Sequence, residues 1–307
     1  MKNRKIIIGS RRSKLAVIYA KKAREEILSY ANNFEVDEVI IKEITTKGDQ
    51  IQNKRLSEIG GKGLFSKTIE IELRDKKIDI AVHALKDMPS DETEGLSTSC
   101  FLERNDPREI LISKDNKYLK DLAPNSIVGT SSFRREFQIK KIREDLVCKL
   151  IRGNVDTRIK KLNDNLYDAI ILSYAGINSL GLSENISQAF STSEIIPCAG
   201  QGVIALQCRN NDEELIRLLK KVNHKNTHNC IKAERSVLKI LEGDCETAVG
   251  VFASIDGDKI NLEAELFSLD GSKRFHLKSS ENVNKADELG IEMGKTLKKI
   301  SNNSYKK

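Results

Sequence analysis

The chain has 307 residues, of which 39% are hydrophobic and 32% are charged, and its formal net charge is +7. At ~150 residues per domain, this length predicts two or three domains, and the composition is typical of a soluble globular protein. No apolar run approaches the ~18 residues that a membrane span needs, and the N-terminal apolar segment is too short for a signal peptide. We therefore expect a cytoplasmic protein.

The positive charge is concentrated in three segments. Residues 1–24 hold nine Lys or Arg and no acid, residues 131–161 hold ten against four acids, and residues 293–307 hold five Lys and no acid. Such local charge indicates sites rather than a uniformly basic surface. Single-stranded nucleic acid needs aromatic stacking platforms, and aromatic residues make up only 5% of the chain, with no Trp. We therefore expect no nucleic-acid partner, and we interpret the C-terminal lysines as a solvated tail.

Apolar strands alternate with helices over the first two thirds of the chain. Strands are expected at residues 6–8, 36–44, 78–83, 126–129, 147–151 and 167–174. Helices are expected at residues 15–29 and 66–76, and after the turns at 130–135 and 152–158. This alternation predicts an α/β protein with largely parallel, doubly wound sheets.

Three of these strands run into a small polar turn that bears Arg at the start of a helix, with the turns beginning at Gly9, Gly129 and Arg152. Helix N-termini favour anions because their first N–H groups are unpaired, although Ser and Thr there can simply be N-caps. Ligands of open α/β sheets bind beyond the carboxyl ends of the strands. The likeness of the turns at Gly9 and Gly129 predicts two similar lobes facing one anion-binding cleft.

Two crossings between the lobes are expected, at residues 102–107 and 196–202, where Pro and turn residues gather. The predicted domains are domain 1 (residues 1–104 with 201–220), domain 2 (residues 105–200) and domain 3 (residues 221–307).

The last third of the chain has a different pattern. A helix is expected from Thr227 to about Leu241, followed by strands at 248–255, 259–268 and 273–279 and a final helix around Met293. Asp-Gly turns separate the strands, which is typical of an antiparallel meander. Domain 3 is therefore predicted to be a small α+β domain with a three-stranded antiparallel sheet.

Two residues stand out as chemically reactive. Asp87 follows a buried strand beside Lys86, and a carboxylate there could stabilise a developing cation, handle a proton or form a structural ion pair. Cys245 lies in a loop of small residues that indicates an accessible thiol, although its acidic neighbours would raise the thiol pKa. On local sequence alone, an ordinary cysteine remains the alternative.

The remaining Cys and His residues favour no metal site. The six cysteines contain no C-x-x-C pair, so we expect free thiols in a reducing compartment. His224, His228 and Cys230 are spaced too loosely for a zinc site. His83, on an alternating strand, is interpreted as a hydrogen-bonded core residue.

Ten short motifs follow one another along the chain. They are Arg11-x-Ser13-x-Leu15-Ala16, Thr46-Lys-Gly-Asp49, Ile59-Gly-Gly-Lys62-Gly-Leu-Phe65, Ala81-Val-His-Ala-Leu-Lys86-Asp87-Met-Pro89, Glu103-Arg-x-Asp-Pro-Arg108, Gly129-Thr-Ser-Ser-Phe-Arg-Arg135, Arg152-Gly-Asn-Val-x-Thr-Arg158, Gly200-Gln-Gly202, Ala233-Glu-Arg235 and Leu241-Glu-Gly-x-Cys245. Each is weak alone, but ten in this order are specific. On these motifs the sequence resembles the hydroxymethylbilane synthase (porphobilinogen deaminase) family over nearly its whole length.

The resemblance implies a transferase that joins four porphobilinogen molecules head to tail, releases ammonia at each step and finally releases hydroxymethylbilane. It implies a dipyrromethane cofactor attached through a thioether to Cys245, and Asp87 as the catalytic carboxylate. The implied anion-binding residues are Arg11, Ser13, Lys62, Lys86, Thr130, Ser131, Ser132, Arg134, Arg135, Arg152 and Arg158. Independently, a chain of pyrroles bearing acetates and propionates needs Arg side chains and helix N-termini as partners.

For the fold, the resemblance implies two doubly wound domains similar to the lobes of type II periplasmic binding proteins, and a third domain that carries the cofactor. It also implies a monomer, and Lys62 on its Gly-rich loop is a candidate lid. The sequence departs from the family at Glu58, Ser179 and Asp244, where Lys, Arg and Gly are usual.

An alternative function is a non-catalytic two-lobed protein that binds an anion or another solute. Such a protein would need neither Cys245 nor Asp87, and would normally carry an export signal or a DNA-binding segment.

Overall fold

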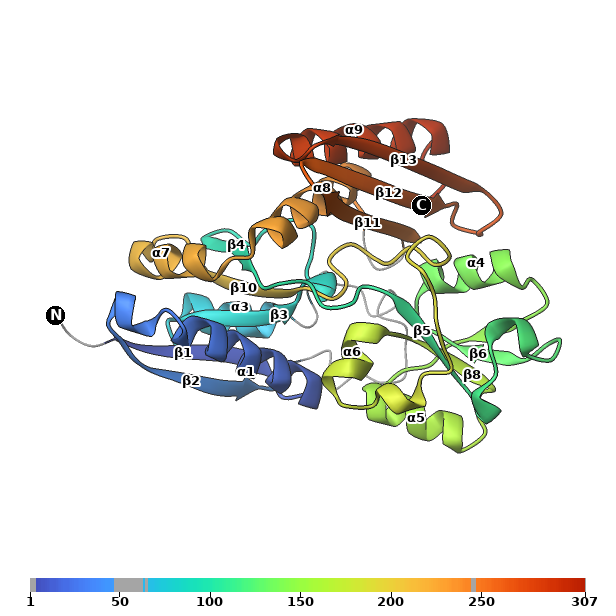
Figure 1. Cartoon of the computed structure of the whole chain (residues 1–307), viewed down its shortest axis with the longest axis horizontal. Helices are drawn as coiled ribbons and strands as arrows, with labels where there is room; N and C mark the ends of the chain where they lie inside the picture. The colour runs from blue at the N-terminus through green and yellow to red at the C-terminus, as the bar shows by residue number, and fades with distance from the viewer. Residues whose placement is uncertain (1–3, 47–62, 64–65, 244–246, 307) are drawn as a thin grey trace. The chain divides into compact units, whose positions relative to one another are not determined.

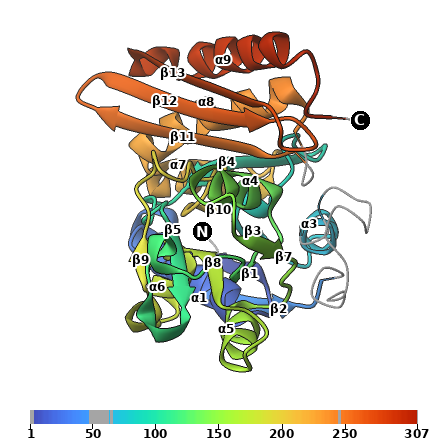
Figure 2. The same ribbon diagram turned by 90° about the vertical axis from the view of Figure 1, so that its right-hand side faces the viewer.

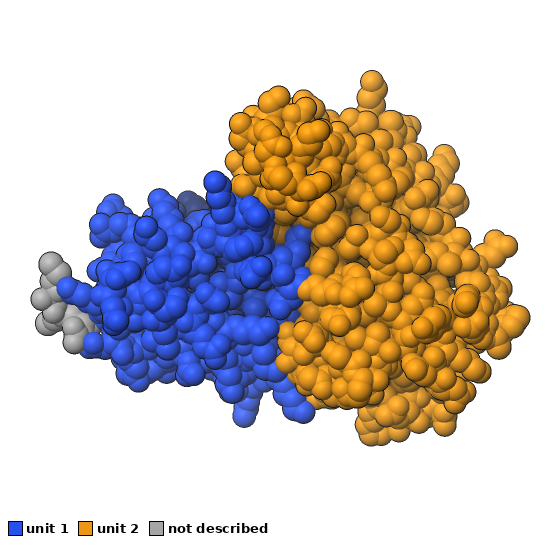
Figure 3. All heavy atoms as spheres, in the orientation of Figure 1, with its two compact units in different colours: residues 1–51, 62–105, 202–228 blue, residues 52–61, 106–201, 229–307 orange. Residues whose placement is uncertain are grey.

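The computed structural model describes residues 4–46, 63, 66–243 and 247–306 (Figure 1). Contacts divide the chain into two compact units (Figure 3). Unit 1 comprises residues 1–51, 62–105 and 202–228, and unit 2 comprises residues 52–61, 106–201 and 229–307. The chain therefore passes from unit 1 to unit 2 after Asn105 and changes unit again after Gln201 and His228.

Unit 1 is built on a five-stranded sheet in the order β2-β1-β3-β10-β4. Its strands are β1 (Arg4–Arg11), β2 (Val36–Ile44), β3 (Ile80–Ala84), β4 (Leu96–Phe101) and β10 (Ile204–Arg209). β1 pairs in parallel with β2 and β3, whereas β10 runs antiparallel to β3 and β4.

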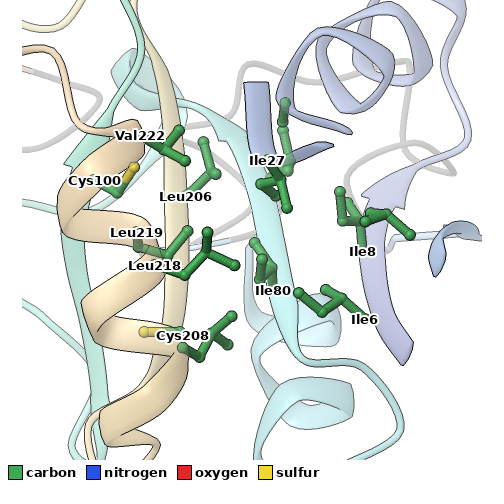
Figure 4. Packing of buried hydrophobic residues seen from close by; sticks show 14 of the residues in the cluster. Ile6, Ile8, Ile27, Ile80, Cys100, Leu206, Cys208, Leu218, Leu219 and Val222 are labelled. Carbon is green, nitrogen blue, oxygen red and sulfur yellow. The ribbon is translucent and has the colours of Figure 1, made fainter. Parts of the chain in front are cut away.

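Helices cover both faces of this sheet. On one face, Leu206 and Cys208 of β10 pack against Leu218 and Leu219 of α7 (Glu213–Val222), in a core shared with α1 (Lys14–Leu28) (Figure 4). The opposite face packs against the apolar side of α3 (Lys67–Arg74). Because successive strand residues point to opposite faces, each strand divides its side chains between these two layers.

Unit 2 contains a second five-stranded sheet, in the order β7-β6-β8-β5-β9. Its strands are β5 (Glu109–Ser113), β6 (Ile127–Gly129), β7 (Val147–Lys149), β8 (Ala169–Ser173) and β9 (Gln188–Ala189). Ile139 of α4 (Phe133–Ile142) packs on one face. Side chains of α5 (Val155–Asn163) and α6 (Tyr174–Ser179) pack on the other.

The two sheets have the same topology. In each, three strands pair in parallel, a fourth (β10 or β5) runs antiparallel to them, and the edge strand (β4 or β9) pairs antiparallel with the fourth and so runs in the direction of the first three. Asp79, just before β3, accepts a hydrogen bond from the Ile7 backbone at 2.9 Å, and Asp168, just before β8, accepts one from Ile127 at 2.7 Å. The prediction of two similar doubly wound lobes with largely parallel sheets is therefore confirmed, with one exception in each sheet. β10 and β5 each follow a change of unit along the chain, and each runs opposite to the other four strands of its sheet.

A third sheet lies within unit 2 and is antiparallel, as predicted. It consists of β11 (Val249–Asp256), β12 (Lys259–Phe267) and β13 (Arg274–Asn282), in that order. Gly257 and Gly271 have φ of 60° and 73° in the two turns, which favours glycine there. α9 (Ala286–Ser301) lies along this sheet (Figure 2), and α8 (Lys225–Leu241) packs against it in the same core.

Short 3-10 helices complete the secondary structure of the described ranges. They are η1 (Ala31–Phe34), η3 (Leu85–Asp87), η4 (Lys114–Asn116), η5 (Leu119–Asp121), η6 (Ser183–Asn185) and η7 (Val283–Lys285). Among the described helices, none has the length and apolar character needed to cross a membrane.

The C-terminal segment is not a solvated tail. Tyr305 is 1% exposed and donates its hydroxyl to the carbonyl of Leu241 at 3.0 Å, at the end of α8. Lys298 and Lys306 both donate to the carboxylate of Glu242, which lowers the pKa of that group to about 2. The interpretation of these lysines as purely solvated is therefore wrong, because two of them hold the end of α8.

We predict that Gly290→Ala destabilises the protein although alanine favours helices. A Cβ at Gly290 would lie 2.2 Å from the carbonyl oxygen of Ala233, so α9 must move away from α8. Overpacking of this kind costs about 1–3 kcal/mol. Lys295→Ala, on the exposed side of α9, should change the free energy of unfolding by less than about 0.5 kcal/mol. Urea unfolding followed by circular dichroism measures both, and equal stabilities would contradict the packing argument.

Candidate active site

In unit 1, the ends of β1 and β3 bring Arg11 and Asp87 together. Asp87 closes the 3-10 turn η3 directly after β3, and its Oδ2 lies 3.9 Å from Nη1 of Arg11 at the end of β1. The Asp87 side chain is 37% exposed, so it remains accessible to a ligand. Ser13 caps α1 by accepting a hydrogen bond from Ala16 N at 3.3 Å. Its own hydroxyl hydrogen is left available, so the capping role predicted as an alternative does not exclude anion binding.

A small pocket of about 50 Å³ opens beside Asp87, large enough for a few water-sized groups. Its polar lining residues are Arg11, Ser13, Ser66, His83 and Asp87, together with Tyr19. Lys86 precedes Asp87 and is half-buried.

His83 is a buried, hydrogen-bonded residue, as interpreted from the sequence. Its Nε2 lies 3.2 Å from Oε1 of Gln207, whose Nε2 donates to Oε1 of Glu70 at 3.1 Å. Thr93 donates to the other oxygen of Glu70 at 2.9 Å. Burial lowers the pKa of His83, so the ring is neutral near pH 7.

In unit 2, two arginines of α4 share one buried carboxylate. Glu109, the first residue of β5, is fully buried, and its oxygens accept from Nη2 of Arg134 at 2.6 Å and of Arg135 at 2.8 Å. Nη1 of Arg134 donates to the carbonyl of Ile196, and Nη1 of Arg135 to that of Ile171. Nε of Arg135 is buried and has no hydrogen-bond partner among the described residues.

The other predicted anion-binding residues of unit 2 follow β6 and β7 along the chain. Ser132 caps α4 by accepting from Arg135 N at 3.4 Å, and Thr130 accepts from Ser132 N at 3.2 Å. Arg152 is buried after β7. Arg158, in α5, donates Nε to the Gly153 carbonyl at 2.8 Å. Ser131, between Thr130 and Ser132, is half-buried.

Some predicted residues cannot be placed. Lys62 and Cys245, together with the departures Glu58 and Asp244, lie outside the described residues. Ser179 is half-buried in the last turn of α6.

The other thiols and the loosely spaced His residues have ordinary surroundings. The five cysteines in the described ranges are free thiols, and burial raises the pKa of Cys208 to about 11, which makes it a poor nucleophile. His224 pairs with Thr227 at 2.8 Å, and His228 with Asn223 at 3.3 Å. Within the part of the chain that the structure describes, no group of three His, Cys, Asp or Glu could hold a metal ion.

Sequence reasoning missed Glu109 and Gln207. A weak signal existed for Glu109, because an acid at the head of the apolar run Glu109–Ser113 must be buried with a cation. Gln207 had the same signal, a polar residue inside the apolar strand Ile204–Arg209. Neither signal identifies the partner, since Arg134 is 25 residues from Glu109 in sequence.

Cationic and polar side chains thus gather near strand ends of both α/β sheets, and an accessible carboxylate lies beside a pocket in one of them. These features are the ones expected of an α/β enzyme that acts on an anionic substrate. Comparison with known proteins identifies the family. A family model described as "Porphobilinogen deaminase, dipyromethane cofactor binding domain" matches residues 6–217, and the porphobilinogen deaminase C-terminal domain matches residues 228–299.

Individual relatives agree. A porphobilinogen deaminase of Staphylococcus carnosus is 42% identical over 297 residues, covering 96% of this chain and 95% of the relative. One of Oceanobacillus iheyensis is 45% identical over 272 residues, covering 88% and 86%. Among solved structures, the periplasmic VFT2 domain of Bordetella pertussis BvgS aligns with a TM-score of 0.42 and 12% identity, covering 71% of this chain and 86% of that domain.

The chain belongs to the porphobilinogen deaminase family. It is accordingly a transferase of tetrapyrrole biosynthesis that forms hydroxymethylbilane from porphobilinogen on a dipyrromethane cofactor, and the alternative of a non-catalytic solute-binding protein is set aside.

We predict that Glu109→Gln lowers the free energy of unfolding by about 3–5 kcal/mol, because it leaves two guanidinium groups buried without a carboxylate. Asp164→Asn is the control. It breaks the ion pair with Lys160, whose side chains are 73% and 47% exposed, and should cost less than about 1 kcal/mol. Urea unfolding monitored by circular dichroism compares the two, and a small effect at Glu109 would show that the buried ion pairs contribute little.

Proposed function

We propose that Asp87 and Cys245 carry the chemistry of this transferase, and that the cations at the strand ends bind the carboxylates of cofactor and substrate. Asp87 is the only member of this set that combines an accessible carboxylate with a pocket in the described part of the chain. The placement of Asp87 beside Arg11 is the observation that carries the proposal, because it sets a base next to a group that binds carboxylates.

The residues around α4 fit a cofactor that bears carboxylates. Arg134 and Arg135 carry two positive charges against the single negative charge of Glu109, so a net positive charge is buried there. Burying such a charge is costly unless an anion compensates it. Nε of Arg135 and the first N–H groups of α4 are suitable donors for a carboxylate. Glu109 thus orients the two guanidinium groups without exhausting their donors.

When bound, dipyrromethane supplies the pyrrole carbon at which the chain of rings grows. Cys245 is the proposed attachment point, and the family motif Leu241–Cys245 supports this assignment. A thiol is suited to form a thioether because sulfur is a strong nucleophile toward an electrophilic methylene carbon.

Asp87 would act on the incoming substrate. Loss of ammonia from porphobilinogen breaks the bond between the methylene carbon and nitrogen, and the pyrrole N–H proton must leave as positive charge develops on the ring. A carboxylate within hydrogen-bond reach of that N–H can accept the proton and stabilise the charge. Arg11, 3.9 Å away, places a guanidinium beside this carboxylate, where it can bind a carboxylate of the substrate.

The other proposed anion-binding residues divide between the units. Unit 1 provides Arg11, Ser13, Lys62 and Lys86, and unit 2 provides Thr130, Ser131, Ser132, Arg134, Arg135, Arg152 and Arg158. Arg side chains bind carboxylates with two parallel hydrogen bonds, which orients as well as attracts. Lys62 is proposed as a lid residue, as its Gly-rich loop suggests.

We further propose the three-domain division predicted from the sequence, with the cofactor on the third. In support, the sheet β11–β13 has a hydrophobic core of its own with α8 and α9. The proposed setting is the cytoplasm, and the proposed form is a monomer without nucleic-acid or membrane partners. Sedimentation analysis of the purified protein tests the monomer.

We predict that intact mass spectrometry of the purified protein shows a covalent addition of two pyrrole units. Cys245→Ser should lack this addition and have no activity, because an oxygen nucleophile does not replace the thiolate. Cys198→Ser is the matched control, and should keep both the addition and the activity. An unmodified wild-type protein with full activity would exclude the proposed attachment.

We predict that Asp87→Asn keeps its fold but loses at least about 100-fold in kcat, the usual contribution of general acid–base catalysis. Asp91→Asn, four residues on and exposed, should retain normal turnover. Ammonia release measures kcat, and circular dichroism checks the fold. Turnover of Asp87→Asn within tenfold of wild type would reject the assigned role.

A further inference from the structure

His83, Gln207 and Glu70 form a hydrogen-bonded series next to the pocket, and the register of the sheet explains why their side chains meet. His83 of β3 lies opposite Ala205 of β10, and Gln207 lies opposite Ala81, so the two side chains are diagonal neighbours on one face. That face packs against α3, whose buried residues include Ile69 and Glu70. The side chains of His83, Gln207 and Glu70 therefore form one buried row that ends at the pocket.

The chemistry of this row fixes the tautomer of His83. Both oxygens of Glu70 accept hydrogen bonds, one from Thr93 and one from the amide nitrogen of Gln207. The Gln207 amide consequently turns its oxygen toward His83, and an amide oxygen only accepts hydrogen bonds. Nε2 of His83 must then carry the hydrogen and donate it at 3.2 Å. In a neutral ring this leaves Nδ1 as a bare acceptor.

Two polar atoms are offered to a ligand by residues that line the pocket. His83 is one of these residues, and the hydrogen bond of its ring described above uses Nε2, not Nδ1. Ser66, 1% exposed, lines the same pocket and precedes α3 without capping it. Its Oγ is buried and has no hydrogen-bond partner in the described ranges. Buried polar atoms without partners are uncommon, and a water molecule or a ligand group bound in the pocket would satisfy this one.

We propose that this pocket binds the ammonium group of the substrate's aminomethyl arm, with Nδ1 of His83, Oγ of Ser66 and the Asp87 carboxylate as its three acceptors. An alkylammonium has three N–H donors and no acceptor, so a site of three acceptors matches it. Gln207 and Glu70 are positioning residues, because they act only through the His83 ring. The inference rests on the proposed function, since it concerns the same substrate.

The proposed site binds the aminomethyl arm, whose nitrogen leaves the substrate as ammonia. When the bond between carbon and nitrogen breaks, the bonding electrons leave with nitrogen as neutral ammonia, and the pyrrole N–H proton passes to the carboxylate of Asp87, the base proposed above. His83, Ser66 and Asp87 need give up no proton in this step. They hold the ammonium against the pocket wall, so that the bond to be broken is fixed relative to the pyrrole ring.

Burial, rather than the surrounding charges, keeps the His83 ring in the accepting form. Burial lowers its pKa from 6.5, with Arg11 acting in the same direction, while Glu70 and Asp87 act to raise it. Protonation would place an N–H and a positive charge against the substrate ammonium. Substrate affinity should therefore be constant from neutral pH down past 6.5, and fall only where the ring finally protonates.

Nitrogen-15 NMR of histidine-labelled holoenzyme tests the tautomer without reference to activity. The chain has only four His, so the signals of His83 are assigned by their loss in His83→Gln. We expect a protonated Nε2 and a bare Nδ1, with no titration near pH 6.5. A ring protonated at Nδ1, or one that titrates like an exposed histidine, would overturn the proposal. In Glu70→Gln the Gln207 amide can turn over, so the two tautomers should mix.

Two substitutions at His83 test the ammonium site. His83→Gln keeps a polar group near the Nε2 position but loses the Nδ1 acceptor, whereas His83→Asn keeps an acceptor near the Nδ1 position. We expect His83→Gln to raise KM for porphobilinogen by about tenfold or more, the effect of losing a hydrogen bond to a charged group. His83→Asn should recover most of that loss, and Ser66→Ala should show a smaller loss.

An analogue with a hydroxymethyl arm in place of the aminomethyl arm separates charge recognition from general damage. Its binding as a competing ligand should differ less than threefold between wild type and His83→Gln, because it has no ammonium. Equal weakening of the amine and the analogue, or a KM for porphobilinogen within twofold of wild type, would refute the site. The same samples are checked by intact mass. If the wild-type protein itself lacks the two-pyrrole addition or does not turn over porphobilinogen, the result counts against the proposed function instead.

Discussion

A carboxylate with no access to solvent, Glu109, organises the charged part of unit 2. It lies at the first residue of β5 and pairs with two consecutive arginines of α4. Neither charge could stay buried alone, so the strand and the helix N-terminus have to remain in register. At the other end of α4, Lys141 pairs with Glu265 of β12, which is also fully buried. α4 is thus held by two buried carboxylates, Glu109 and Glu265. Through them it connects the arginines at its N-terminus with the third sheet.

The two α/β sheets share one topology but present different side chains where their strands end. Asp79 and Asp168 occupy equivalent positions and make the same backbone contact, and Ser13 and Ser132 cap the equivalent helices. The third strand of each sheet ends differently. β3 runs into a 3-10 turn that presents Asp87, whereas β8 runs into α6. The shared parts build the scaffold, and the unlike turns give one sheet an accessible carboxylate while the other has a cluster of arginines.

Much of this arrangement is predictable from local sequence, because strand alternation, capping residues and Asp-Gly turns act over a few residues. The strand at 36–44 and the meander match the structure closely. What could not be predicted depends on distant partners. The roles of Glu109 and Gln207 depend on contacts between distant segments, β5 with α4 and β10 with α3. The reversed direction of β10 and of β5 could not be predicted for the same reason, since it depends on where the chain enters each unit.

The attachment of the C-terminal segment to the end of α8 bears on how the protein is made. Tyr305 and Lys306 hold Leu241 and Glu242, which precede Cys245 closely in the sequence. These contacts cannot form while the last residues are still inside the ribosome, although domains begin to fold as they emerge. The unit 1 sheet and the strand-end arginines can therefore be in place before the end of α8 has its final contacts. A polypeptide released a few codons early would keep every residue proposed for the reaction and yet lack the contacts that hold the end of α8.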